Sequence, residues 1–180
     1  MYQWLDEVKQ NIKKRRQALF SKDSEFLADL AELFAARSHR VMVLWALDFA
    51  AESVAELERA YPDEHRPREA LEAARQWAAG EVKMRYAQRK ILDCHAVART
   101  LSDPAAIAGC HAVGQACAVV HTDGHALGYP MYDLTAIVRR LGPDSCREAV
   151  EARKAEYISR LFYWDAHAAD HQGAWAEFLS

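Results

Sequence analysis

The feature that most constrains the fold is an uncharged run of small residues over positions 104–121. Alanine, glycine and cysteine predominate in this run, and it holds no Lys, Arg, Asp or Glu. If the run is helical, small side chains surround the helix, so neighbouring helix axes can approach to the short end of the usual range of about 8–10 Å. We therefore expect it to form the central helix of a bundle, because it is also too short and too polar to span a bilayer.

The rest of the chain predicts an all-α, single-domain bundle of about eight helices around this central one. Apolar residues recur at helical spacing, and no stretch alternates with the period of two that marks a half-buried strand. We assign one domain to residues 1–180. The expected helices span residues 2–19, 24–36, 38–61, 67–80, 81–101, 104–121, 125–141 and 145–164.

Several helix ends carry recognisable signals. Ser38 and Asp103 suit the N-cap position, and a proline at position 67 or 104 suits a first helical turn. Residues 145–148, Ser-Cys-Arg-Glu, fit the capping box. Pro130 lies within an expected helix, so we expect an irregularity or kink there.

Composition excludes several classes of protein. The chain has 23 basic and 26 acidic residues, a formal net charge of −3, whereas nucleic-acid-binding domains are usually strongly basic. No apolar signal core occupies the first residues, so the four cysteines are expected to be reduced thiols in the cytoplasm. We expect no nucleic-acid partner and no membrane association.

Eight histidines raise the question of a metal site. Cys117, His121 and His125 would share one face of an unbroken helix, and zinc accepts such ligands. However, Asp123 and Gly124 predict a break in that helix, and no C-x-x-C or H-E-x-x-H motif is present. We therefore expect no metal, no cofactor and no catalytic residue.

A buried polar network inside the bundle is the more economical interpretation of these side chains, since buried imidazoles need hydrogen-bond partners. We assign to it His111, Gln115, His121 and His125. A Cys-His-Ala-Val tetrapeptide also occurs twice, at 94–97 and 110–113. Adjacent residues on a helix do not face each other, so neither Cys–His pair forms a catalytic dyad by itself.

Asp48, Glu52 and Glu56 are spaced four residues apart and form an acidic ridge along one expected helix. The ridge is either the solvated face of an amphipathic helix or a contact surface for a basic protein partner. Complementary charge accelerates protein association, so in the second case replacing the ridge with alanine should slow binding at low salt.

One block of sequence carries a family resemblance. Residues 66–81 read R-P-R-E-A-L-E-A-A-R-Q-W-A-A-G-E, and residues 125–128 read H-A-L-G. With these motifs the chain resembles the Imm-five-like family of immunity proteins of bacterial polymorphic toxin systems, over about residues 38–165. The resemblance implies a small all-helical cytoplasmic protein, not an enzyme, that neutralises a cognate protein toxin by stoichiometric, non-covalent binding.

Arg66 and Arg68 open this block. Either they anchor their loop through bidentate pairs with Glu or Asp, which we favour, or they contact the toxin directly. Two other functions for the chain stay open. One is a helical adaptor or oligomeric scaffold, with a homodimer among its forms; the other is a metal-dependent enzyme with a site around His111, His121 and His125. Metal content and a neighbouring toxin gene distinguish these alternatives.

Overall fold

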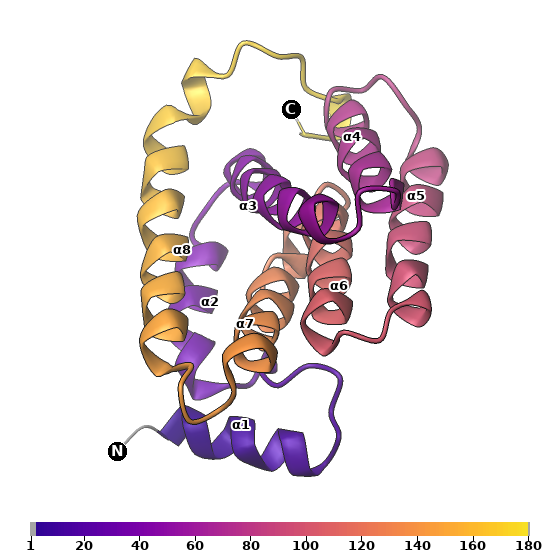
Figure 1. Cartoon of the computed structure of the whole chain (residues 1–180). Helices are drawn as coiled ribbons and strands as arrows, with labels where there is room; N and C mark the ends of the chain where they lie inside the picture. Colours follow the sequence, from indigo (N-terminus) through magenta and orange to yellow (C-terminus); the bar gives the residue numbers. More distant parts are fainter. Residues whose placement is uncertain (1–2, 180) are drawn as a thin grey trace.

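The computed structural model describes residues 3–179 and contains α-helices, short 3-10 turns and, over that range, no strand. The all-α prediction is therefore confirmed (Figure 1). The helices are α1 Gln3–Lys13, α2 Ala28–Ala35, α3 His39–Ala60, α4 Arg66–Ala78, α5 Met84–Val97, α6 Pro104–Ala118, α7 Gly128–Leu141 and α8 Arg147–His167.

The central helix is α6, as its small residues predict. It contacts α3, α4, α5 and α7, and Figure 1 shows it enclosed among them. Asp103 caps it by accepting a hydrogen bond from the backbone N–H of Ala105 at 3.1 Å, and Pro104 occupies the first turn. One edge departs from full enclosure, because Ile107, His111 and neighbouring residues of that stripe are only half-buried.

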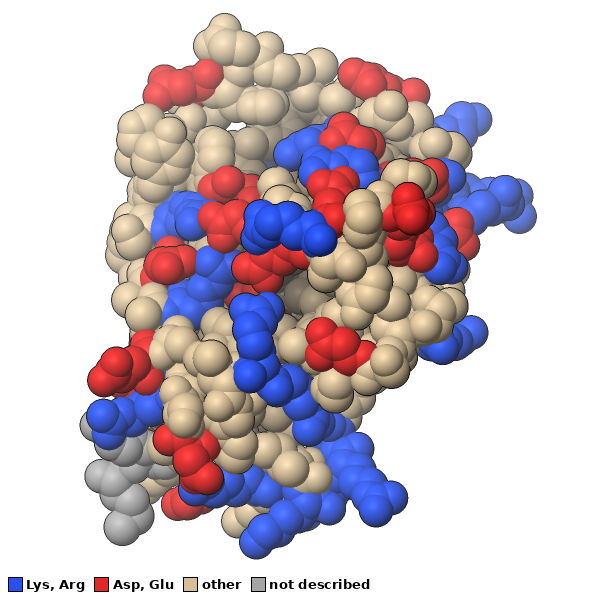
Figure 2. Space-filling model, viewed as in Figure 1, with Lys and Arg blue, Asp and Glu red and all other residues tan. Residues whose placement is uncertain are grey.

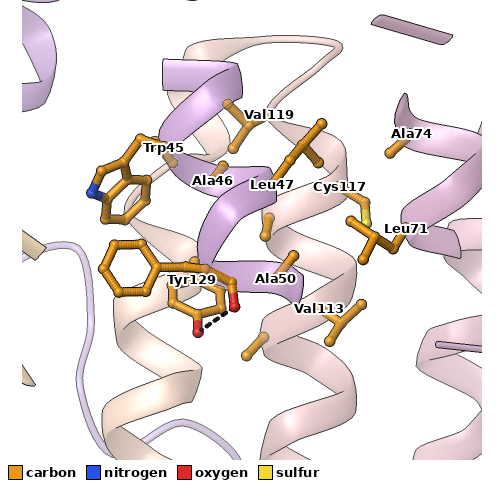
Figure 3. Packing of buried hydrophobic residues seen from close by; sticks show 14 of the residues in the cluster. Trp45, Ala46, Leu47, Ala50, Leu71, Ala74, Val113, Cys117, Val119 and Tyr129 are labelled. Atoms are coloured by element: carbon orange, nitrogen blue, oxygen red, sulfur yellow. Dashed lines mark hydrogen bonds between the residues drawn. The ribbon is translucent and has the colours of Figure 1, made fainter. Parts of the chain in front are cut away.

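Helix α3 supplies the largest apolar side chains of the core. Ser38 caps it, with the side chain accepting a hydrogen bond from the Val41 backbone N–H. Trp45 is fully buried, and its indole N–H donates to the Tyr157 carbonyl oxygen of α8 at 3.0 Å. Figure 3 shows aromatic side chains of α3 and α7 packed on one side and the small residues of α3 and α6 on the other, where the backbones approach closely.

Several predicted helix ends are wrong. Helix α1 ends at Lys13, short of the expected residue 19, because Arg15 has a φ of 54° and reverses the chain. The expected start, residue 2, lies outside the described residues. Pro130 causes no kink, since it sits in the first turn of α7, where its missing N–H costs no hydrogen bond. Ser145 forms no capping box, because Cys146 is the N-cap of α8 and makes no side-chain cap.

The segment after α8 returns across the molecule to α3 and α4. The Ala176 N–H donates to the Ala78 carbonyl oxygen at 2.7 Å, and the rings of Phe178 and Trp77 lie 5.9 Å apart. Arg40 of α3 stacks over Trp175. This segment therefore docks on the helices, and the buried apolar residues from Trp4 to Leu179 form one continuous cluster.

Candidate functional site

The acidic ridge of α3 faces a row of arginines from α7 and α8. Glu52 accepts hydrogen bonds from Arg153 at 2.9 Å and from Arg160 at 2.6 Å. Asp48 accepts from the indole N–H of Trp164 at 3.0 Å, while Glu56 pairs with Arg140 at 3.2 Å. The three carboxylate side chains remain 36%, 42% and 53% exposed respectively, so the ridge is both partnered and accessible.

Arg153 lies at the centre of this network. Its Nε atom donates to Asp133 at 2.8 Å, Nη1 donates to Glu52 and Glu156, and Nη2 donates to the Tyr129 hydroxyl at 3.2 Å. The guanidinium also lies over the Phe49 ring, 4.8 Å from its centroid. Burial alone would lower the pKa of Arg153, but the charge of Asp133 raises it well above its usual value, so the side chain stays cationic.

The neighbouring tyrosines complete the network from the core side. Tyr157 donates its hydroxyl proton to Asp133, and the Tyr129 hydroxyl bonds with Ser53 at 2.8 Å and donates to the Phe49 carbonyl oxygen. Burial, followed by the charge of Asp133, raises the pKa of both tyrosines well above 10. Both hydroxyls therefore remain protonated, and their hydrogen bonds link α3, α7 and α8.

We call these ridge carboxylates, their arginines and the residues Asp133 and Glu156 the arginine–carboxylate network. It contains five carboxylates against the three guanidinium groups of Arg140, Arg153 and Arg160. In Figure 2, acidic and basic side chains intermix over the part of the molecule where α3, α7 and α8 lie in Figure 1. Burial alone would raise the pKa of Glu52, but hydrogen bonds from Arg153 and Arg160 leave it lowered. The surface is therefore net negative even though each ridge carboxylate has a partner.

The four residues assigned to a buried polar network are not brought together. His111 and Gln115 are half-buried on one edge of α6, but His121 and His125 lie at the surface after the helix ends. The His121 ring stacks on Trp77, with centroids 6.1 Å apart. The expectation of burial was wrong for these two histidines, because α6 stops at Ala118 and the chain turns outward there.

The imidazole contact that does form joins His111 to His95, which was not among the four residues predicted for the buried network. The Nδ1 atoms of His95 and His111 lie 2.8 Å apart, and the Cys94 thiol donates to the Cys110 carbonyl oxygen at 3.5 Å. The two copies of the Cys-His-Ala-Val tetrapeptide thus meet across the α5–α6 contact. The repeat itself was the signal that could have identified this pair.

The hydrogen bonds around this pair run in one direction. Tyr132 donates to the Oε1 atom of Gln17, and the Gln17 amide nitrogen donates to His111 Nε2 at 2.9 Å. A neutral His111 must then carry its proton on Nδ1 and donate it to His95. Burial lowers the pKa of both histidines, to about 4 for His95, where the adjacent His111 adds to the effect. Both rings are therefore neutral at physiological pH.

The two arginines at the start of α4 form bidentate ion pairs. Arg66 binds Glu64 through Nε and Nη2, at 2.8 and 2.6 Å. Arg68 binds Glu58 of α3 in the same manner, with both distances 2.8 Å. Such forked pairs are geometrically specific, so Arg66 connects the α3–α4 loop to α4, and Arg68 joins α4 to α3.

The thiols offer no reactive nucleophile. The side chains of Cys94, Cys110, Cys117 and Cys146 are free and buried. Burial raises the pKa of Cys110 and Cys117 to about 12, so both are protonated at neutral pH. Across residues 3–179, no group of three or more His, Cys, Asp or Glu side chains is arranged to hold a metal ion.

Comparison with known protein families gives a match. Residues 32–160 match the family described as "Imm-5 like putative immunity protein". The chain belongs to this immunity protein family. The matched region runs from α2 to within α8 and so includes the acidic ridge, both arginines at the start of α4 and Arg153. Neither a curated protein nor a solved structure matches the chain.

The family match covers nearly the same residues as the predicted resemblance. The match begins six residues before the predicted start at 38 and ends five residues before the predicted end at 165. Helix α1 and the segment that docks on α4 therefore lie outside the immunity protein match. None of the helices described over residues 3–179 is both long enough and apolar enough to cross a membrane.

Proposed function

We propose that this protein binds a cognate protein toxin and neutralises it by stoichiometric, non-covalent inhibition. The family match over residues 32–160 is the observation that carries the proposal. The toxin, in this proposal, is encoded beside the immunity gene, and the protein acts without catalysing a reaction.

The chemistry of the interior supports binding rather than catalysis. Buried tyrosines and thiols are held protonated, and Arg153 is committed to four hydrogen-bonded partners. An inhibitor needs a rigid scaffold that presents a preorganised surface, because ordering side chains on binding reduces affinity. The arginine–carboxylate network provides such rigidity by linking α3, α7 and α8.

The acidic ridge remains a candidate contact surface within this proposal. Its carboxylates are about half exposed and already fixed in position by Arg140, Arg153 and Arg160. A basic toxin surface would find preorganised acceptors there, but the arginines weaken the field that attracts it. We also propose a cytoplasmic location, which the four free thiols support because thiols persist in reducing compartments.

Co-expression tests the proposal. The neighbouring gene is first shown to arrest growth when expressed alone, and the immunity protein is then expressed with it. We expect growth to recover and purified proteins to bind one to one in isothermal titration calorimetry. If growth is not rescued from a neighbour proven toxic, and no complex forms, the proposed function is wrong.

A further inference from the structure

Helix α5 presents an unusual outer face at the edge of the molecule. Arg85, Arg89, Leu92, Ala96 and Arg99 are spaced by four and three residues in alternation, so they form one straight stripe along the helix and the 3-10 turn that extends it. We call these five residues the α5 stripe. All but Ala96 are exposed, while Ala87, Ile91 and Cys94 bury the opposite face against the bundle.

The three arginines of the α5 stripe are uncompensated. Among the described residues, none pairs with the guanidinium groups of Arg85, Arg89 or Arg99, whereas the adjacent Lys90 pairs with Glu69 at 3.0 Å. Figure 2 shows Lys and Arg side chains projecting from the edge where α5 lies in Figure 1. The stripe thus contrasts with the acidic ridge, where every carboxylate already has a cationic or indole partner.

A large apolar side chain lies in the middle of these charges. Leu92 is 67% exposed, the highest value among the large hydrophobic side chains described, and Met84 and Tyr86 on the same helix are 44% and 48% exposed. Arginine, methionine and aromatic residues are enriched at protein interfaces, whose centres are more apolar than their rims. The composition of this helix is therefore that of an interface without its partner.

We propose that the α5 stripe is the principal surface through which the protein contacts its toxin, and that it takes an acidic region of the toxin around Leu92. This inference rests on the function proposed above. The charge of the stripe selects carboxylates or phosphates, and Leu92 decides between them. A phosphate backbone offers nothing apolar to cover this side chain, whereas an acidic protein surface can enclose it, and the overall charge of −3 disfavours nucleic acid.

The test measures association of the purified immunity protein with the toxin encoded beside its gene, by stopped flow at low and high salt. The Arg85→Glu, Arg89→Glu double variant should associate about ten- to a hundredfold more slowly at low salt, with a smaller effect at high salt. The Lys13→Glu, Lys14→Glu variant changes the total charge equally on exposed residues outside the stripe. We expect it to keep at least a third of the wild-type rate.

A second pair of variants tests the apolar centre. Leu92→Ala should raise the dissociation constant about tenfold, because the apolar contact with the toxin is lost. Leu141→Ala removes a side chain that is 45% exposed on α7 and should leave the constant unchanged. Circular dichroism checks that both variants are folded.

The outcomes separate this inference from the proposed function. If wild-type protein neutralises the toxin but the stripe variants bind it equally well, the α5 stripe is not the contact surface and the proposed function stands. The same holds if Glu56→Lys, on the acidic ridge, slows binding more than the Arg85, Arg89 double variant does. A gel shift with a 30-base-pair DNA duplex provides a further check, since DNA binding that requires these arginines would overturn the assignment to a protein partner.

Discussion

His95 and His111 face each other across the α5–α6 contact, with their Nδ1 atoms 2.8 Å apart and both rings neutral. Only one proton can lie between two such atoms. Protonating His95 as well would place a charge in a half-buried site and set two N–H donors against each other, so burial, followed by the neighbouring His111, lowers the pKa of His95 to about 4.

This pair predicts a loss of stability in mild acid. In the unfolded chain His95 titrates near the ordinary pKa of 6.5, but in the fold it resists protonation until about pH 4. The unfolded state therefore takes up a proton as the pH falls through this window, while the folded state does not. We expect the free energy of unfolding to fall by about 1–2 kcal/mol between pH 6.5 and 4.5, allowing for solvent screening. Urea unfolding at several pH values measures it, and His95→Gln should reduce the slope.

Replacing Arg153 tests the arginine–carboxylate network. Arg153→Ala leaves Asp133 and Glu52 without their central cation, in a site where Arg153 is only 16% exposed. We expect a loss of about 3–5 kcal/mol in the free energy of unfolding, the usual cost of removing one partner of a buried pair. Arg140→Ala breaks an exposed pair with Glu56 and should cost less than about 1 kcal/mol. Equal effects of the two substitutions would contradict the central role of Arg153.

Two glycines of α6 should respond oppositely to alanine. At Gly114 a methyl group would lie 2.3 Å from His95 Nε2, so the ring must leave its bond with His111. At Gly109 the nearest atom, on Leu57, is 3.6 Å away, which is an ordinary contact. Gly109→Ala should raise stability by about 0.5–1 kcal/mol through helix propensity, whereas Gly114→Ala should lower it by about 1–3 kcal/mol. Thermal unfolding measures both effects.

The Gly114 prediction has an internal control. Adding His95→Ala to Gly114→Ala removes the clash, so the double variant should be more stable than the sum of the two single changes predicts. Strict additivity would show that His95 does not press on Gly114.

The thiols should be unreactive until the protein unfolds. All four cysteines are buried, and burial raises the pKa of Cys110 and Cys117 to about 12, so the reactive thiolate is scarce and inaccessible. Ellman's reagent should react slowly with the native protein and rapidly with all four thiols in guanidinium chloride. Rapid reaction of one thiol under native conditions would identify an open cysteine that this structure excludes.

Local signals predicted much of the fold. The uncharged small residues after Asp103 identified the central helix, and Ser38 marked the start of α3 because an N-cap depends only on neighbouring backbone groups. Predicted helix ends were wrong where the local sequence was compatible with both a continuing helix and a turn. The chain turns after α1 at Arg15, which has a positive φ. Glycine is the usual sequence signal for a positive φ, and no glycine stands at this position.

The candidate sites depend on contacts that sequence spacing does not reveal. Glu52 and Arg153 are 101 positions apart in the sequence, so the periodicity of the ridge on α3 indicated an exposed ridge without indicating the arginines that cover it. The repeated tetrapeptide held the information for the His95–His111 contact, but only the antiparallel packing of α5 on α6 makes the two copies face each other.

The position of Arg153 also limits how α8 can detach. Its guanidinium binds one residue from α3, two from α7 and one from its own helix, so sliding α8 by a single turn would separate all the interhelical partners at once. No partly shifted position of α8 would therefore keep the interhelical hydrogen bonds of Arg153. Amide hydrogens of α8 and of the middle of α3 should therefore exchange with deuterium at a common rate, as one cooperative unit.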